Sequence, residues 1–294
     1  MNIAIVTDST CDLGPAAEFA YQIDMVPLTV SFGNTVYRDV VDLSGTEFYS
    51  LLSKSSSLPT TSQPPPAAFS DVFRKRLDEG KEIIAILLSS AISGTYQSAK
   101  IARDALNPEE QAMVHLIDSK NATGCLGILV LEAVRMRDAD ANVEEICSHV
   151  ADLASRVRLY AILDTLRYLR MGGRLSAAAA VAGSLLNTVP IVSMRDGNII
   201  AAAKIRKSQN AFRKWLRDRL NNELPDQAYP VIYLHSGNVA IIDQLQEEFQ
   251  YLLPQDKIFR LFIGSVVGTH AGTGASGIAY VTKAATVSGD NNVS

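Results

Sequence analysis

The segment IIAILLSSAISGTYQS, residues Ile83–Ser98, decides the fold class. Its first six residues, Ile83–Leu88, are all apolar, which is typical of a strand that is covered on both faces. A polar turn rich in hydroxyl groups follows, and a helical pattern then runs over Thr95–Leu106. A buried strand that leads through a polar turn into a helix is the repeating unit of a parallel α/β sheet.

The same alternation extends over the first half of the chain. Strands are expected at Ile3–Val6, Met25–Phe32 and Met113–Ile117. Helices are expected at Ala16–Tyr21, Ser44–Leu52, Pro64–Glu79, Gly124–Met136 and Val143–Val157. We therefore predict an α/β fold whose N-terminal parallel sheet has helices on both faces. Ligands of such sheets lie beyond the carboxyl ends of the strands.

The pattern changes near Arg156, where an α+β arrangement begins. Pro190–Ile205 is predicted to be a β-hairpin, because the Asp196-Gly197 pair suits a tight turn. Further strands are expected at Leu159–Leu163, Val231–Leu234, Phe259–Ile263 and Gly277–Val281, helices at Thr165–Leu169, Gln209–Leu220 and Ile241–Leu252, and a loop at Arg170–Arg174. We predict two domains, residues 1–155 and 156–283. Residues 284–294 are expected to fray.

Composition restricts the class of protein. The chain has 294 residues, 47% of them hydrophobic and 20% charged, which is typical of a globular protein. Its net charge of −4 gives no electrostatic reason to expect nucleic acid. The three cysteines have neither C-x-x-C spacing nor a metal-like cluster, which indicates reduced thiols. With no signal-peptide pattern and no stretch that could span a bilayer, a cytoplasmic protein without a metal site is expected.

Two polar segments are the candidates for a binding site. They are Pro59–Pro64, which reads PTTSQP, and the turn that begins at Ser89. Both place hydroxyls and free backbone N–H groups at the start of a predicted helix, where a small anion can be held. No nucleophile–base pair accompanies them. The two segments therefore predict a site that holds a carboxylate or a phosphate without reacting with it.

Each candidate residue also has a structural interpretation. Ser93 can be a helix N-cap, and Thr61 can stabilise a turn through its hydroxyl. His270 can be a packing residue or a hydrogen-bond donor. Asp8, at the end of the first strand, is either a cap or a nucleophile. Arg170 and Arg174 can form a solvated surface pair.

Eight segments carry a resemblance to a known family. They are Asp8–Leu13, Val26–Val30, Tyr37–Asp39, Pro59–Pro64, Leu88–Ala99, Ile117–Ser119, Leu166–Ser176 and Ile263–Gly272. In this order they resemble the motifs of the DegV family. The resemblance covers about residues 3–281.

The resemblance implies a two-domain protein that binds a long-chain fatty acid, similar to the B subunits of bacterial fatty acid kinase. The acyl tail would be buried between the domains. The carboxylate would be offered to a separate ATP-using subunit, which makes acyl phosphate for phospholipid synthesis. No cofactor is implied beyond the bound acid. On this view the protein is a carrier and not itself an enzyme.

The family motifs also imply roles for particular residues. Thr61 and Ser93 would bind the carboxylate, and His270 would lie close to it. Ser62, Gly94 and Thr95 would be their neighbours in the site. Arg170 and Arg174 would lie near the mouth and face the kinase subunit or a membrane surface. The main alternative is a small-molecule phosphotransferase or hydrolase that uses Asp8 or Ser93, and a lipid-sensing regulator is a third interpretation.

Overall fold

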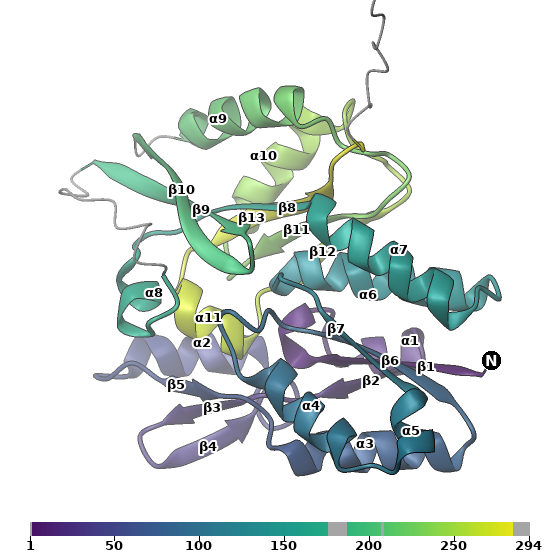
Figure 1. The fold of residues 1–294 in the computed structure, drawn as a ribbon. Coiled ribbons are helices and arrows are strands. Elements are labelled where there is room, and N and C mark those ends of the chain that lie inside the picture. Colours follow the sequence, from purple (N-terminus) through teal and green to yellow (C-terminus); the bar gives the residue numbers. More distant parts are fainter. Residues whose placement is uncertain (1, 176–186, 207–208, 285–294) are drawn as a thin grey trace, which may run out of the picture.

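The computed structural model describes residues 2–175, 187–206 and 209–284. Figure 1 shows a parallel sheet in the lower half, a larger sheet in the upper half, and helices between them. Fraying was predicted for residues 284–294, of which 285–294 lie outside the described residues. Over the described residues, no helix has the length and apolarity that crossing a bilayer requires.

The N-terminal parallel sheet is the predicted one. Its strands are β1 (Ile3–Asp8), β2 (Ile23–Val26), β6 (Glu82–Leu87) and β7 (Val114–Asp118), in the order β2-β1-β6-β7. Helices α3 (Pro66–Asp78) and α4 (Thr95–Asp104) cover one face, and α6 (Thr123–Asp138) and α7 (Val143–Arg156) cover the other. Shorter helices α1 (Ala17–Ala20) and α5 (Pro108–Ala112) connect the strands. The expectation of helices on both faces is confirmed.

A small antiparallel sheet was not predicted. It consists of β3 (Thr29–Phe32), β4 (Thr35–Arg38) and β5 (Thr60–Ser62), in the order β4-β3-β5. The single strand expected at Met25–Phe32 is wrong, because the chain leaves the parallel sheet at Pro27. Proline has no N–H for a ladder, and the Leu28 N–H donates instead to the Ser9 hydroxyl at 3.1 Å. Helix α2 (Gly45–Lys54) follows this sheet and begins with the expected capping box.

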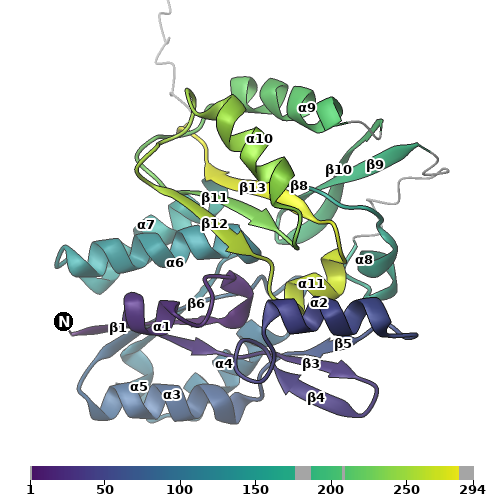
Figure 2. The same ribbon diagram turned by 180° about the vertical axis from the view of Figure 1, so that it is seen from behind.

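The C-terminal sheet is mixed and has six described strands. They are β8 (Val157–Ile162), β9 (Thr188–Arg195), β10 (Asn198–Arg206), β11 (Val231–His235), β12 (Ile258–Phe262) and β13 (Ser276–Val281), in the order β10-β9-β8-β13-β11-β12. Helices α9 (Gln209–Asn222) and α10 (Val239–Phe249) cover its outer face, as Figure 2 shows. The predicted hairpin around Asp196-Gly197 is present as β9 and β10.

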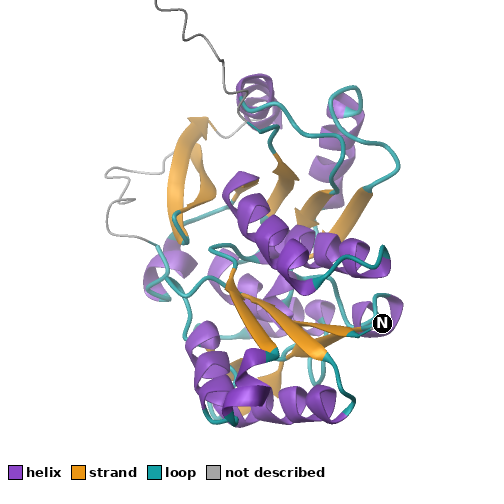
Figure 3. Ribbon diagram, turned by 45° about the vertical axis from the view of Figure 1, so that its right-hand side comes forward, coloured by secondary structure: helices purple, strands orange, loops and turns teal. Residues whose placement is uncertain are grey.

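Helix α6 packs between the two large sheets (Figure 3). It is apolar on nearly all sides, as a helix buried on every face must be. A Cβ on Gly124 would lie 3.1 Å from side-chain atoms of Ala279 and Ile232, so glycine allows this close approach. One apolar cluster extends through both sheets. The division into domains at residues 1–155 and 156–283 therefore stays a prediction.

Two short helices near the centre differ from expectation. Helix α8 (Arg167–Met171) includes Arg170, which was expected in a loop, and helix α11 (Ser265–Ala271) was not predicted at all. The sequence of α11 is SVVGTHA, in which glycine and β-branched residues are poor helix formers. Its stability must come from tertiary contacts, and it carries His270.

Candidate functional site

A cavity lies between the carboxyl ends of the parallel strands and the inner face of the C-terminal sheet. Its empty volume, including the open end, is about 950 Å³. Residues that follow two of the parallel strands, and residues of the small sheet, the C-terminal sheet and α11, contribute to its wall. They include Thr10 and Leu88 after β1 and β6, Thr61 on β5, Ser93 before α4, Leu159 and Ala161 on β8, Val192 and Met194 on β9, and Val266 and His270 on α11.

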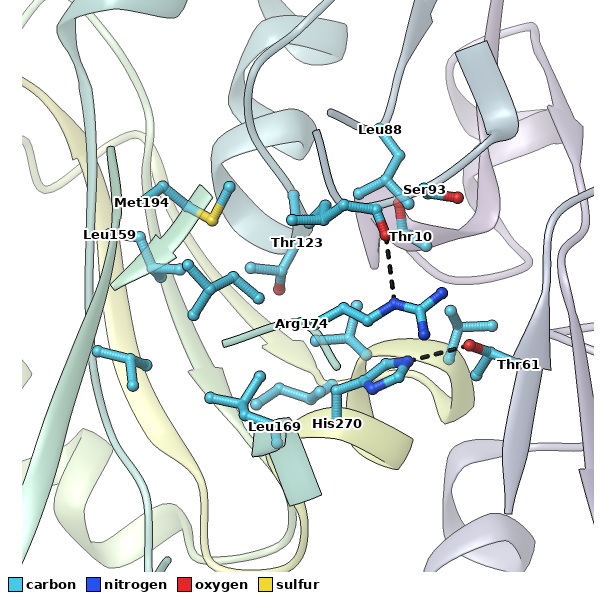
Figure 4. Close-up of a pocket in the computed structure, with 18 of the residues that line it drawn as sticks. Thr10, Thr61, Leu88, Ser93, Thr123, Leu159, Leu169, Arg174, Met194 and His270 are labelled. Atoms are coloured by element: carbon cyan, nitrogen blue, oxygen red, sulfur yellow. Dashed lines mark hydrogen bonds between the residues drawn. The ribbon is translucent and has the colours of Figure 1, made fainter. Parts of the chain in front are cut away.

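The polar groups of this cavity are concentrated toward one side. Figure 4 places Thr61, Ser93 and His270 on one side and Leu159 and Met194 on the other. The apolar side consists mainly of aliphatic residues from the C-terminal sheet. Such a shape suits an elongated apolar ligand with one polar end.

The central polar contact joins Thr61 to His270. Thr61 Oγ1 lies 3.0 Å from His270 Nε2, although the two residues are 209 positions apart. Pairing with Val30 in the small sheet fixes Thr61, and α11 fixes His270. Burial, followed by the charge of Arg174, lowers the pKa of His270 to about 4. The imidazole is therefore neutral near pH 7.

The neutral imidazole leaves a hydroxyl proton available at Thr61. In the tautomer that carries its hydrogen on Nε2, His270 donates to Thr61 Oγ1. The Thr61 hydroxyl can then donate its own hydrogen to a ligand in the cavity. His270 Nδ1 is buried and has no hydrogen-bond partner among the described residues. The pair thus presents an uncharged donor at the polar end.

Ser93 lies in the cavity wall but is not the helix N-cap. The N-cap of α4 is Gly94. The Ser93 hydroxyl lies 2.9 Å from Thr95 Oγ1 and accepts the Thr95 N–H at 3.3 Å. When Thr95 donates its hydroxyl hydrogen to Ser93, the Ser93 hydroxyl is free to donate into the cavity.

The other residues expected near the carboxylate take two kinds of position. Ser62 lies in the cavity wall, and so does Gln63. Gly94 and Thr95 do not line the cavity but lie next to residues that do. A Cβ on Gly94 would lie 3.0 Å from the Gln63 side-chain nitrogen, and Thr95 is completely buried. These two residues support the site from outside the cavity.

The structure places a charge in the site at Arg174, which was expected near its mouth. This residue lies in the cavity wall, where it is the one formally charged member among the described lining residues. Its Nε donates to the Ile92 carbonyl at 3.3 Å and its Nη1 to the Gly172 carbonyl at 2.6 Å. Arg170 is exposed on α8 and does not line the cavity. Its role toward a partner or a membrane stays a prediction.

Asp8 is engaged in structural hydrogen bonds. It is completely buried and accepts the Thr10 N–H at 3.0 Å and the Leu88 N–H at 2.7 Å. It caps the short helix η1 (Ser9–Cys11) and does not line the cavity. His270 bonds to Thr61 and not to Ser93, so the described residues show no base beside that serine. The geometry favours the capping interpretation of Asp8.

Comparison with known proteins shows the family. The model described as "Uncharacterised protein, DegV family" matches residues 2–283. The chain belongs to the DegV family. It is 37% identical to a DegV domain-containing protein of Caldanaerobacter subterraneus, over 96% of this chain and 99% of that protein. It is 32% identical to Protein DegV of Bacillus subtilis, over 96% of this chain and all of that protein.

Solved structures of other DegV proteins share the fold. One from Thermus thermophilus, described as showing fatty acid binding, has a TM-score of 0.85 at 29% identity and covers 96% of this chain and 100% of that chain. A stearic acid-binding protein from Eubacterium ventriosum also has a TM-score of 0.85, at 28% identity, and covers 95% and 98%. The fatty acid binding protein DegV from Bacillus subtilis has a TM-score of 0.80 at 31% identity and covers 96% and 100%.

The described residues of this DegV protein offer no candidate metal centre. Among the described residues, no group of three or more histidine, cysteine or acidic side chains is placed to bind an ion. Cys11, Cys125 and Cys147 are free thiols, and burial raises the pKa of Cys125 to about 12. The described polar groups of the cavity wall include hydroxyl, imidazole and guanidinium groups.

Two buried aspartates hold the start of α11. Asp12 accepts the Gly264 N–H at 3.1 Å and the Thr123 hydroxyl at 2.6 Å. Asp39 accepts the Ser265 N–H at 3.2 Å and the Ser265 hydroxyl at 2.5 Å. Carboxyl oxygens at a helix N-terminus accept hydrogen bonds from N–H groups that have no partner within the helix. These bonds help to place His270 in this DegV protein.

The Asp12 carboxyl makes stability depend on pH. Burial raises its pKa from 3.8 to about 8, with nearby Asp39 and Asp8 adding to the effect. The folded protein therefore binds a proton that the unfolded chain releases, and the free energy of unfolding falls as the pH rises between these values. Replacing Asp12 by asparagine removes this titration and keeps the shape of the side chain.

We expect Asp12→Asn to flatten the pH dependence of stability. Near pH 4 the variant and the wild type should have similar free energies of unfolding, and toward pH 8 the difference should grow in favour of the variant by up to about 1.4 kcal/mol per pH unit. Urea unfolding at several pH values measures this difference. Parallel curves for the two proteins would show that Asp12 does not titrate differently on folding.

Gly172 makes room for the imidazole. A Cβ at this position would collide with His270 Nδ1. We expect Gly172→Ala to displace the ring and lower the free energy of unfolding by about 1–3 kcal/mol. NMR of the His270 ring, together with urea unfolding, measures both effects. Met171→Ala, at the exposed neighbouring residue, is the control; a Gly172→Ala spectrum like that of the control would contradict the prediction.

Proposed function

We propose that this DegV protein binds a long-chain fatty acid. The observation that carries the proposal is the cavity itself, which is aliphatic on one side and presents Thr61, Ser93 and His270 on the other. The solved DegV structures described as fatty acid binding add independent support. The acyl tail would lie along the inner face of the C-terminal sheet, and the carboxylate would meet the three polar side chains.

The tail would supply most of the affinity. Burial of about fourteen methylenes at roughly 0.8 kcal/mol each gives a gross gain near 11 kcal/mol, before the costs of ordering the ligand. The head group would supply orientation. A buried carboxylate takes up a proton unless donors compensate for its desolvation. Thr61 and Ser93 would donate hydroxyl hydrogens to it, with the Thr61 hydroxyl oriented by His270.

Arg174 would stabilise the acid without clamping it. Its guanidinium already donates to two backbone carbonyls, so part of its donor capacity is used. Its charge nevertheless favours an anion in the cavity. A bound carboxylate would in turn raise the pKa of the nearby His270, because an opposite charge favours the protonated ring.

We further propose that the bound carboxylate is presented to a separate ATP-dependent fatty acid kinase subunit for acyl-phosphate formation. The support is the resemblance to kinase B subunits, together with donors that do not enclose the carboxylate in a full ionic clamp. In this proposal the protein is a cytoplasmic carrier, with transient contact to a membrane surface. Exposed Arg170 on α8 would face the partner or the membrane.

The enzyme alternative has less support. A phosphotransferase or hydrolase needs an accessible nucleophile, whereas Asp8 is buried and bonded to backbone N–H groups. Mass spectrometry separates the two functions. Denaturation of the purified protein should release about one fatty acid per chain, with an unmodified polypeptide mass. A covalent adduct on Asp8 or Ser93 would instead favour the enzyme.

A further inference from the structure

The C-terminal sheet has an opening beside the lipid cavity. Strands β8 and β9 pair at only two positions, Ala161 with Val192 and Ile162 with Ile191. In the same antiparallel register Leu159 would face Met194, but the ladder stops before it reaches them. On their outer sides both strands continue to pair, β8 with β13 as far as Val157 and β9 with β10 as far as Arg195. The two strands therefore separate within the sheet.

A second, polar groove lies on the other side of this opening. Its wall contains ionic and polar groups from β7, β8, β9 and α9 and their flanking turns. They include Asp118, Lys120, Arg158, Tyr160, Arg219 and Glu223. Strand β8 separates this groove from the lipid cavity, because Leu159 and Ala161 line the cavity whereas Arg158 and Tyr160 line the groove.

Two residues of β9 line both spaces. They are Ser193 and Met194, at the point where the ladder ends. Met194 is half-buried, and Figure 4 places it beside Leu159, on the side of the cavity away from Thr61 and Ser93. Its long side chain is the larger of the two. At this point the Met194 side chain, and not hydrogen-bonded backbone, separates the lipid cavity from the groove.

We propose that Met194 closes the tail end of the cavity and thereby sets the longest acyl chain that the protein accepts. This inference rests on the proposed fatty-acid binding and adds a specificity determinant to it. Leu159 is less suited to closing the cavity, because it lines the cavity but not the groove. In addition, β8 holds Leu159 opposite Ala279 of β13. Methionine is unbranched and flexible, so it can fit chain ends of slightly different length.

Met194→Ala removes the three atoms beyond Cβ and opens the cavity toward the groove. A chain longer by two carbons can then stay buried, at a gain of about fourfold in affinity for each methylene. We expect the affinity for this longer acid, relative to the best acid of the wild type, to rise by roughly tenfold. Met194→Phe should shift the preference toward shorter acids, because the ring is bulkier and stiffer.

Val192→Ala is the matched control. Val192 lies on the same strand two residues earlier and lines only the lipid cavity, where the ladder with β8 is intact. This change widens the cavity without opening its end. It should change the preference for longer acids by less than about twofold.

The experiment is a competition between saturated fatty acids that differ in steps of two carbons, with delipidated protein and mass spectrometry of the bound fraction. Opposite shifts for Met194→Ala and Met194→Phe, with none for Val192→Ala, support the inference. The wild-type preference in both Met194 variants, or an equal shift in the control, overturns it while fatty-acid binding stands. A wild type that binds no acid of the series overturns the proposed function and this inference together.

Discussion

Replacing Ala161 by phenylalanine is expected to weaken the binding of long-chain fatty acids by at least about 100-fold. Ala161 lies on β8, and its side chain lines the cavity next to Leu159 and Leu163. A ring at this position would occupy the space of roughly four methylenes, each of which contributes about 0.8 kcal/mol when buried. The ligand-free protein should stay folded, because the ring fills an existing hollow.

Binding of a fluorescent fatty acid and thermal unfolding together measure this prediction. Ala161→Val adds less volume and should give an intermediate loss of affinity, of about tenfold. Such a graded series distinguishes filling of the cavity from general damage to the sheet. Wild-type affinity in a folded Ala161→Phe protein would mean that the acyl chain lies elsewhere.

The combined change of Thr61 and Ser93 to alanine should separate lipid binding from phosphoryl transfer. The aliphatic wall is intact in this variant, so fatty acid should still co-purify. The carboxylate loses two donors, each worth about 1.5–3 kcal/mol when it bonds to a charged group. The carboxylate should then be less well placed for the kinase subunit, so acyl-phosphate formation should fall by about 100-fold or more.

Formation of acyl phosphate by the ATP-dependent subunit, with lipid-loaded protein as substrate, is the measurement. Ser90→Ala is a suitable control, because Ser90 belongs to the same turn but hydrogen-bonds to Asp118 and lies outside the cavity wall. Unchanged transfer in the double variant would reject both assignments. Parallel loss of lipid and transfer would make the two hydroxyls affinity determinants instead.

The sequence predicts the parallel sheet well because its signals are local. The apolar run at Ile83–Leu88 and the capping spacing at Ser44 each act within a few residues, and both elements are present. Polar residues after parallel strands also converge as expected, since Thr10 and Ser93 both line the cavity. Asp118, the last residue of β7, bonds to Ser90 and Lys120 outside the cavity. The ends of the strands therefore predict where the site lies but not which residues line it.

The rest of the site depends on contacts between distant residues. The bond between Thr61 and His270 spans 209 positions, and α11 forms despite a poor helical sequence because Asp12 and Asp39 satisfy its first N–H groups. Neither contact leaves a periodic signal in the sequence. The inward position of Arg174 likewise depends on the carbonyls of Ile92 and Gly172.

The depth of the cavity likewise depends on contacts between residues that are distant in the sequence. It depends on where β8 and β9 stop pairing, which follows from the twist and curvature of the whole sheet. The hairpin itself is predictable from Asp196-Gly197, but the position of Met194 relative to β8 is not. A sequence pattern can therefore predict a lipid cavity without predicting the length of its ligand.

The most direct test of the account is ¹³C NMR of a fatty acid that is labelled at its carboxyl carbon and bound to the protein. We predict a single resonance that does not follow the titration of the free acid in solution, because the carboxyl group is buried among donors. This resonance should move in Thr61→Ala and in Ser93→Ala. A bound carboxyl that titrates like the free acid, and that neither substitution affects, would contradict the proposed site.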